Sequence, residues 1–194
     1  GSSFEREICK QLSLWYSEGR RDDIFWRTAG SGARATVRKR RGKDTEGQHG
    51  DIGKSSVEGS PLIDKWYIEL KTGYSRKTKT KEGVKQTNWG ILDLLDSKGK
   101  FKFLEFWMDT DNNAMAHRKS PILIFRRIYK VPCIAMNQST YCDFVNLYNE
   151  PKDGRILIHL TYFDIVIMNL TDFFSWVKQP RLFFTGKISV RRTL

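Results

Sequence analysis

A β-strand with two chemically different faces is predicted by the stretch Trp66-Tyr67-Ile68-Glu69-Leu70-Lys71-Thr72-Gly73. Its aromatic and branched residues favour an extended backbone, in which successive side chains point to opposite faces. One face is apolar and is expected to contact a core, whereas the other carries Glu69 and Lys71. A carboxylate and an ammonium at the end of an apolar strand are costly unless something uses them. The strand therefore predicts a functional site.

A second carboxylate lies upstream, in Gly50-Asp51-Ile52. We expect residues 51–57 and 65–71 to form a hairpin, with Gly59-Ser60-Pro61 in the connection. An Asp followed by Glu-x-Lys has the spacing needed to hold a divalent cation against a phosphodiester. Two carboxylates supply the hard oxygen ligands that Mg2+ prefers, and the lysine is a point charge for the attacking water. The pattern predicts a Mg2+ site in which Mn2+ is expected to substitute.

Composition and charge limit the class of protein. The 194 residues are expected to form one domain spanning 1–194, and 39% hydrophobic and 13% aromatic residues are typical of a globular chain. A net charge of +12 favours a polyanionic partner, nucleic acid first and an anionic membrane second. No apolar run approaches the roughly 20 residues of a membrane span, and no signal-peptide pattern is seen. Three cysteines without metal-type spacing predict reduced thiols and a cytoplasmic or nucleoid location.

Two basic segments flank the candidate carboxylates, one on each side of the Asp51 and Glu69 motifs in the sequence. This is the electrostatic footprint expected of a groove that binds a sugar-phosphate backbone. A solvated loop or a nuclear-targeting peptide would look similar to the first segment. The DNA-contacting residues predicted in the two segments are Arg34, Arg38, Lys39, Arg40, Arg41, Lys43, Arg76, Lys77, Lys79 and Lys81.

Periodicity and turn signals predict the remaining elements along the chain. We expect an amphipathic helix over 4–19, a short strand over 23–27, a helix over 82–97, a turn at 109–113, strands over 121–125 and 131–135, a helix over 141–148, one long or two short strands over 156–170, a helix over 173–177 capped by Thr171 or Asp172, and a strand or arm over 181–192. The three histidines are scattered in the sequence, and no nucleotide-binding P-loop or nucleophile elbow is present.

Four short motifs occur in one order along the chain: Phe4-Glu5-Arg6-Glu7-Ile8, Arg27-Thr28-Ala29-Gly30-Ser31, Gly50-Asp51-Ile52 and Ile68-Glu69-Leu70-Lys71. This order resembles the PD-(D/E)XK nuclease superfamily, and most closely the archaeal-type Holliday junction resolvases. The resemblance covers residues 4–95. Gly50 stands where the motif name has proline, and the segment between Ser31 and Asp51 is longer and more basic than in the small resolvases.

The resemblance implies both a site and a fold. It implies that Glu5, Asp51 and Glu69 hold the metal and that Lys71 serves the hydrolytic water. Taken alone, Glu5 also fits a solvated glutamate favoured by the helix dipole. The family positions close to the DNA backbone are matched by Arg6, Arg27 and Ser31. The implied fold is α/β and restriction-endonuclease-like, with a mixed central sheet, helices on both faces, and residues 120–194 completing the sheet.

The leading hypothesis is a Mg2+-dependent DNA endonuclease that hydrolyses phosphodiester bonds, in the manner of a Holliday junction resolvase of DNA recombination or repair. A symmetric homodimer would place two sites on opposing strands. The alternatives are a restriction- or repair-type nuclease on linear duplex, and a non-catalytic DNA-binding protein in which Glu69 and Lys71 are only an ion pair. An RNA-directed or membrane-surface protein explains the charge but not the carboxylates. No small-molecule cofactor is expected. The candidate dimer surface, alternatively a buried core, is Phe173, Phe174, Trp176, Phe183 and Phe184.

Overall fold

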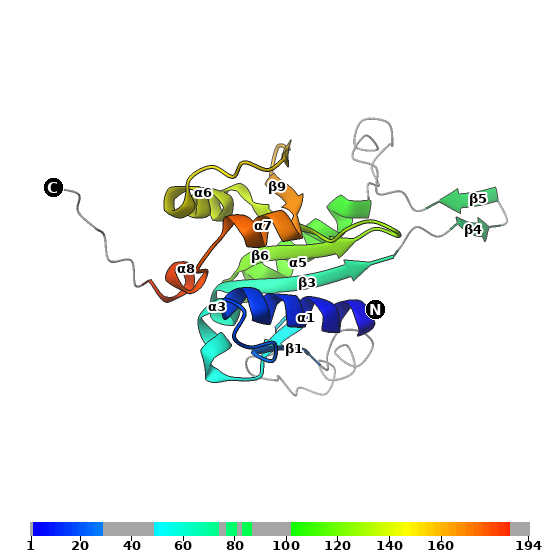
Figure 1. Ribbon diagram of the computed structural model, residues 1–194. Helices are drawn as coiled ribbons and strands as arrows, with labels where there is room; N and C mark the ends of the chain where they lie inside the picture. The colour runs from blue at the N-terminus through cyan, green and yellow to red at the C-terminus, as the bar shows by residue number, and fades with distance from the viewer. Residues whose placement is uncertain (1, 29–48, 74–76, 81–82, 87–101, 187–194) are drawn as a thin grey trace.

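The computed structural model describes residues 2–28, 49–73, 77–80, 83–86 and 102–186. A five-stranded sheet runs through the molecule in the order β3-β6-β7-β9-β8 (Figure 1). Its β3 and β6 are parallel, and the other neighbours are antiparallel. The strands are β3 (Trp66–Thr72), β6 (Ser120–Arg126), β7 (Cys133–Asn137), β8 (Arg155–His159) and β9 (Asp164–Asn169). The predicted α/β fold with a mixed sheet and flanking helices is confirmed.

Alternating side chains divide the interior into two cores, one on each face of the sheet. On β3, Trp66, Ile68 and Leu70 enter the larger core, as the strand pattern predicts. On β6, Leu123 and Phe125 enter the smaller core, on the opposite face of the sheet. Each large apolar side chain buried in this way contributes about 1.5–3 kcal/mol. The sheet is therefore covered on both faces, as its near-continuous apolar strands require.

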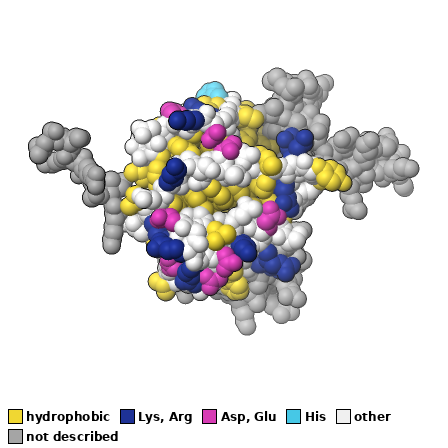
Figure 2. All heavy atoms as spheres, viewed as in Figure 1, with side chains coloured by type: hydrophobic (Ala, Val, Ile, Leu, Met, Phe, Trp, Pro, Cys, Tyr) yellow, Lys and Arg dark blue, Asp and Glu magenta, His cyan; other side chains and the backbone are white. Residues whose placement is uncertain are grey.

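The helices are distributed unequally over the two faces (Figure 1). The smaller core is closed by α5 (Lys102–Ala116). The larger core receives side chains from α1 (Ser2–Tyr16), α3 (Ser60–Lys65), α6 (Gln138–Tyr148), α7 (Leu170–Trp176) and α8 (Arg181–Thr185). Figure 2 shows that apolar, basic and acidic side chains are interspersed on the visible face. None of the helices formed by the described residues is long and apolar enough to cross a membrane.

The contact between α1 and a small two-stranded sheet brings the predicted motifs toward β3. The small sheet pairs β1 (Phe25–Arg27) with β2 (Ile52–Lys54) in antiparallel fashion. The buried hydroxyl of Ser13 donates to the Cys9 carbonyl at 2.8 Å and accepts the Phe25 N–H at 3.0 Å. Since Ser13 lies on α1, this bond ties β1 to the helix.

The predicted hairpin between residues 51–57 and 65–71 is wrong. β2 pairs with β1, and a 3-10 helix (Val57–Gly59) followed by α3 separates it from β3. Pro61 lies at the start of α3, where its fixed φ and missing N–H suit a helix. Gly53 lies opposite Trp26, and a Cβ on Gly53 would come within 2.8 Å of the indole nitrogen. This close approach to Trp26 favours the pairing with β1.

Two predictions in the middle of the chain are also wrong. Residues 83–86 form β5 (Gly83–Gln86), which pairs with β4 (Lys77–Thr80), so the predicted helix 82–97 does not begin there. Residues 87–97 lie outside the described residues. The predicted turn at 109–113 lies inside α5, where Thr110 and Ala114 are buried four residues apart. Packing of this helical face overrides the turn preference of the Asp and Asn residues around it.

Of the two alternatives predicted for residues 156–170, the structure has two short strands, β8 and β9. Other C-terminal predictions need correction. The cap of α7 is Asn169 and not Thr171 or Asp172, because the Asn169 side chain accepts the N–H groups of both. Residues 181–185 form a helix instead of a strand, because Phe183 and Phe184 pack into the larger core. Phe173 is buried in the same core, so these three aromatics are not available to a second copy.

Candidate active site

Asp51 lies against the outer edge of β3 and takes the place of a strand partner. Its N–H donates to the Ile68 carbonyl at 2.9 Å. Its side-chain Oδ2 accepts the Leu70 N–H at 2.8 Å. Only 6% of Asp51 is exposed. Hydrogen bonds from both its backbone and its side chain therefore fix this carboxylate beside the strand that carries Glu69 and Lys71.

Glu69 and Lys71 share one face of β3, as the strand pattern predicts. The Lys71 ammonium forms an ion pair with Glu69 Oε1, and the Tyr67 hydroxyl lies 3.4 Å from Glu69 Oε2. The side chains of Glu69 and Lys71 are 17% and 20% exposed, so both are partly accessible to solvent. Lys71 Nζ also lies 5.4 Å from the ring centre of Phe106, on α5. The two charged groups are thus held between the sheet and the helix that covers it.

Negative charge dominates the electrostatics around Asp51. Burial, and next the nearby charge of Glu69, raise the pKa of Asp51 to about 7, although the Leu70 N–H and Lys71 oppose the shift. Burial, and next the charges of Glu69 and Asp51, raise the pKa of Tyr67. Burial, and next the charges of Glu5 and Asp51, raise the pKa of Cys9 to about 12. A cation placed between these carboxylates would relieve the repulsion. The charge at the site therefore favours a bound cation.

Glu5 approaches this site from the first turn of α1. Its Oε2 accepts from Arg27 Nη1 at 3.2 Å, and its side chain is 16% exposed. Glu5 adds a smaller repulsion to the pKa shift of Asp51. Among the described residues, no group of three or more His, Cys, Asp or Glu side chains is arranged to hold a metal. The structure thus brings Asp51 beside the strand that carries Glu69 and Lys71 and pairs Glu5 with Arg27, and the metal-binding roles of Glu5, Asp51 and Glu69 stay predictions.

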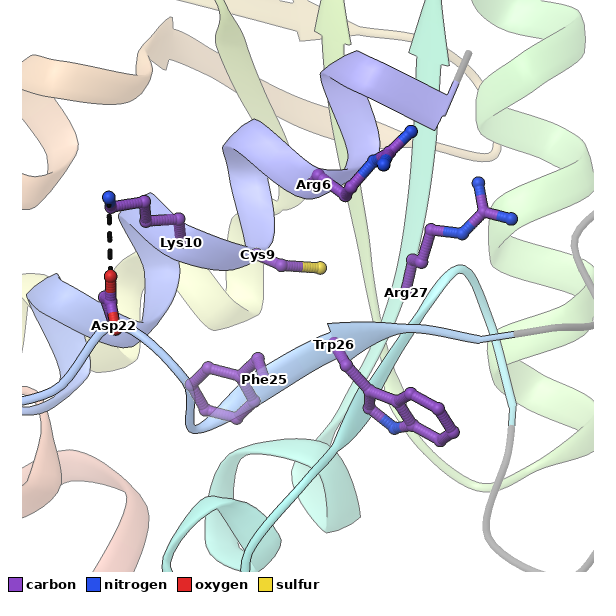
Figure 3. A pocket seen from close by; sticks show the side chains of 7 residues that line it. All are labelled: Arg6, Cys9, Lys10, Asp22, Phe25, Trp26 and Arg27. Atoms are coloured by element: carbon purple, nitrogen blue, oxygen red, sulfur yellow. Dashed lines mark ion pairs between the residues drawn. The ribbon is translucent and has the colours of Figure 1, made fainter.

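The predicted DNA-contacting residues are only partly within the described chain. Arg6 and Arg27 line one cavity between α1 and β1 (Figure 3). Lys77 and Lys79 fall on β4. Outside the described residues lie Ser31, Arg34, Arg38, Lys39, Arg40, Arg41, Lys43, Arg76 and Lys81. DNA contact by these two basic segments stays a prediction.

A group of stacked rings that no sequence motif indicates lies beside Tyr67, the neighbour of Glu69 on β3. The rings of His49 and His117 stack with their centres 3.6 Å apart, and His117 lies parallel to Tyr67 with a centre separation of 6.1 Å. The two histidines were expected to be scattered, and nothing in their spacing signals a contact. They meet because the end of α5 and the residues before Gly50 both reach the Tyr67 face of β3.

Gly50 has a structural reason to differ from the proline of the motif name. Its φ is +86°, whereas proline is fixed near −65°. A Cβ at this position would also lie 2.6 Å from the Ile68 carbonyl oxygen. This is the carbonyl that accepts the Asp51 N–H. Glycine therefore allows the backbone to approach β3 closely enough to seat Asp51.

Gly50→Ala is expected to lower the free energy of unfolding by about 3–4 kcal/mol, because it adds a collision to backbone strain. Gly73→Ala is the matched control: Gly73 has φ +84°, but a Cβ there meets nothing within 4 Å. Backbone strain alone should lower the free energy of unfolding of Gly73→Ala by about 1–2 kcal/mol. Urea unfolding of both variants measures the difference. Equal losses in the two variants would contradict the close approach at Gly50.

The family described as "Phage putative PDDEXK endonuclease" matches this chain over residues 1–183. The chain belongs to this family. The predicted membership of the PD-(D/E)XK superfamily is thereby confirmed, and the match extends well beyond the four motifs, which end at Lys71. Comparisons with curated proteins and with solved structures gave no match. The closer resemblance to archaeal-type resolvases is not confirmed and stays a prediction.

Proposed function

We propose that this phage-type PD-(D/E)XK protein is a divalent-metal-dependent DNA endonuclease whose site is formed by Glu5, Asp51, Glu69 and Lys71. The observation that carries the proposal is the buried carboxylate of Asp51, fixed beside the Glu69–Lys71 pair and raised in pKa by burial and by that neighbour. Perturbed acids next to a specific charge partner are typical of catalytic sites. The net charge of +12 supports a nucleic acid as the substrate.

Each side chain has a distinct part in phosphodiester hydrolysis. Asp51 and Glu69 present carboxylate oxygens, the ligands that Mg2+ and Mn2+ prefer, and Glu5 is the proposed third carboxylate. A bound divalent cation supplies a Lewis acid that stabilises charge on the phosphate. Lys71 donates a hydrogen bond to the attacking water or to the phosphate oxygen on which charge develops. Glu69 holds the Lys71 ammonium in place for this contact.

The proposed substrate is branched DNA, cut by a symmetric homodimer. The motif order, which resembles that of archaeal-type resolvases, supports this choice, and a C2 pair of sites matches the symmetry of a four-way junction. We also propose that the protein is cytoplasmic or nucleoid-associated. This location is supported by the free thiols of Cys9, Cys133 and Cys142.

Cleavage of a labelled four-way junction, compared with a linear duplex of matched sequence, tests the substrate. In Mg2+ or Mn2+ we expect paired symmetric cuts in the junction, at least about tenfold faster than cuts in the duplex, or about 1.4 kcal/mol in the barrier. Ca2+ prefers a looser ligand shell and should allow binding without cleavage.

The other outcomes of this experiment separate the alternatives. Equal cutting of both DNAs would keep the nuclease and discard the preference for junctions. Tight binding without cleavage of any DNA in Mg2+ or Mn2+ would leave a DNA-binding protein in which Glu69 and Lys71 form only an ion pair.

A further inference from the structure

The loop over residues 127–131, which joins β6 to β7, exposes apolar side chains. Tyr129 is 100% exposed, and its neighbours Ile128 and Val131 are exposed as well. The cations Arg127 and Lys130 lie in the same loop and are also exposed. A single exposed apolar side chain needs no explanation, whereas three of them interspersed with two cations indicate a contact surface. The charges favour an anionic partner, and the aromatic ring favours a partner with flat faces on which it can stack.

Tyr129 has a backbone conformation that tyrosine rarely adopts. The Lys130 N–H donates to the Arg127 carbonyl at 3.1 Å and closes a β-turn. Tyr129 occupies the third position of this turn, with φ +60°. Turns with a positive φ at this position normally carry glycine or asparagine, because a Cβ makes the conformation strained. A bulky side chain that is kept at a strained position and lies outside the core points to a use of the ring in binding.

The base of the loop is fixed to two elements that carry the candidate active site. The carbonyl of Arg126, the last residue of β6, accepts the Gly73 N–H at 3.2 Å, directly after β3 ends. The Arg126 guanidinium pairs with Glu7 at 2.8 Å and lies 4.5 Å from the ring centre of Phe4. Both residues lie on the same part of α1 as Glu5. Figure 1 shows the start of α1 and the ends of β3 and β6 on the same side of the molecule.

This placement limits the distance between Tyr129 and the proposed chemistry. Lys71 is the strand partner of Phe125, and Tyr129 follows Phe125 by four residues. Neighbouring strands lie about 5 Å apart and an extended chain spans about 3.5 Å per residue, so the Cα atoms of Tyr129 and Lys71 are no more than about 20 Å apart. Bases follow one another at about 3.4 Å along a DNA strand. The ring is therefore within about six base pairs of the bond that the carboxylates would cut.

We propose that Tyr129 stacks on the open face of a base pair at a branch in the DNA substrate, with Arg127 and Lys130 on the flanking phosphates. The DNA class rests on the proposed function. In a continuous duplex each base pair is covered by the next, and a ring that inserts must first unstack them. At a branch the stack is already interrupted, so the ring gains stacking at little cost. The 127–131 loop therefore selects branched DNA for the neighbouring carboxylates.

Binding to a four-way junction and to a linear duplex of matched sequence, both in Ca2+, tests this proposal. We expect Tyr129→Gly to lose about 5- to 100-fold in affinity for the junction, at unchanged affinity for the duplex. Glycine accepts a positive φ, so this variant should melt at no lower temperature than wild type. Tyr129→Phe, which keeps a ring, should retain the affinity for the junction. The fluorescence of 2-aminopurine at the branch point should change when wild type binds and stay unchanged when Tyr129→Gly binds.

Tyr162 provides the matched control, because it is 88% exposed in the hairpin that joins β8 to β9. β9 begins beside the end of β7, whereas the 127–131 loop precedes the start of β7. The two tyrosines therefore lie at opposite ends of the sheet, and Tyr162→Gly should bind both DNAs like wild type.

The remaining outcomes separate this proposal from the proposed nuclease. Equal weakening of junction and duplex binding by Tyr129→Gly would overturn the stacking contact. Unchanged binding to the junction would overturn it too, and would leave the loop to a protein or membrane partner. A loss confined to the junction and to Tyr129→Gly would support the contact even if no DNA is cut. Cleavage of DNA with unchanged junction binding in Tyr129→Gly would keep the nuclease and discard the contact.

Discussion

Asp51→Asn is expected to lower DNA cleavage by at least about 1,000-fold and at the same time to stabilise the fold above pH 7. The amide keeps the size of the side chain, and its oxygen can still accept the Leu70 N–H that now bonds Oδ2 at 2.8 Å. It removes a negative charge that the proposed metal needs. Removing the charge also ends the repulsion with Glu69 that contributes to the raised pKa of Asp51.

The stability effect has a definite sign and pH window. Asp51 titrates at about 7 in the folded protein and near 4 in an unfolded chain. Between these values the folded state binds more protons than the unfolded state, so stability falls as pH rises from about 4 to 7. The amide introduced by Asp51→Asn does not titrate. The variant should therefore match wild type near pH 4 and exceed its free energy of unfolding by about 1–3 kcal/mol at pH 8.

Urea unfolding at pH 5 and pH 8 measures this effect, and cleavage assays measure the loss of activity. Mg2+ should raise the melting temperature of wild type at pH 8 and raise that of Asp51→Asn much less, because the variant loses one of the proposed carboxylate ligands. Asp153→Asn, at an exposed loop position, is the matched control and should change neither property. If Asp51→Asn cuts DNA at the wild-type rate, Asp51 is not part of the catalytic site, whatever the stability of the variant.

Local sequence patterns were sufficient to predict the features that depend on a single secondary-structure element. The alternation of Trp66, Ile68 and Leu70 predicted which face of β3 is buried, because a strand has a strict period of two. The same alternation placed Glu69 and Lys71 together on the other face, where they form an ion pair. The apolar run 121–125 likewise predicted β6, since its length suits a buried strand and not a helix.

Features that depend on tertiary contacts could not be predicted in the same way. The partner of β2 is decided by the fit of Trp26 over Gly53, which no propensity reports. The turn-like residues at 109–113 form helix because Thr110 and Ala114 are buried on one face of α5. At the site, the motifs identified Asp51 as a candidate, but its raised pKa arises from burial that only the folded chain creates.

Lys71→Met is expected to lower the rate of DNA cleavage by about 100- to 10,000-fold, the range usual for a positioned group that handles a proton or a developing charge. Methionine keeps an unbranched side chain of similar length, so it should preserve the contact with Phe106 of α5 while removing the ammonium. A partly exposed ion pair contributes only about 0–1 kcal/mol, so little stability should be lost with the Glu69 contact. Affinity for DNA should change little, because one positive charge is lost from a chain that carries a net +12.

Lys152→Met is the matched control, since Lys152 is exposed in the loop before β8 and should leave cleavage unchanged. Single-turnover cleavage, with affinity measured separately in Ca2+, distinguishes a lost chemical step from lost binding. An equal drop in both variants would show that the effect is general electrostatics, as expected for a polyanionic substrate. If Lys71→Met cuts DNA at the wild-type rate, Glu69 and Lys71 form only an ion pair at the edge of the sheet and have no catalytic role. A loss confined to Lys71→Met would mean that this lysine acts on the reacting phosphate, because the two variants remove the same charge at different places.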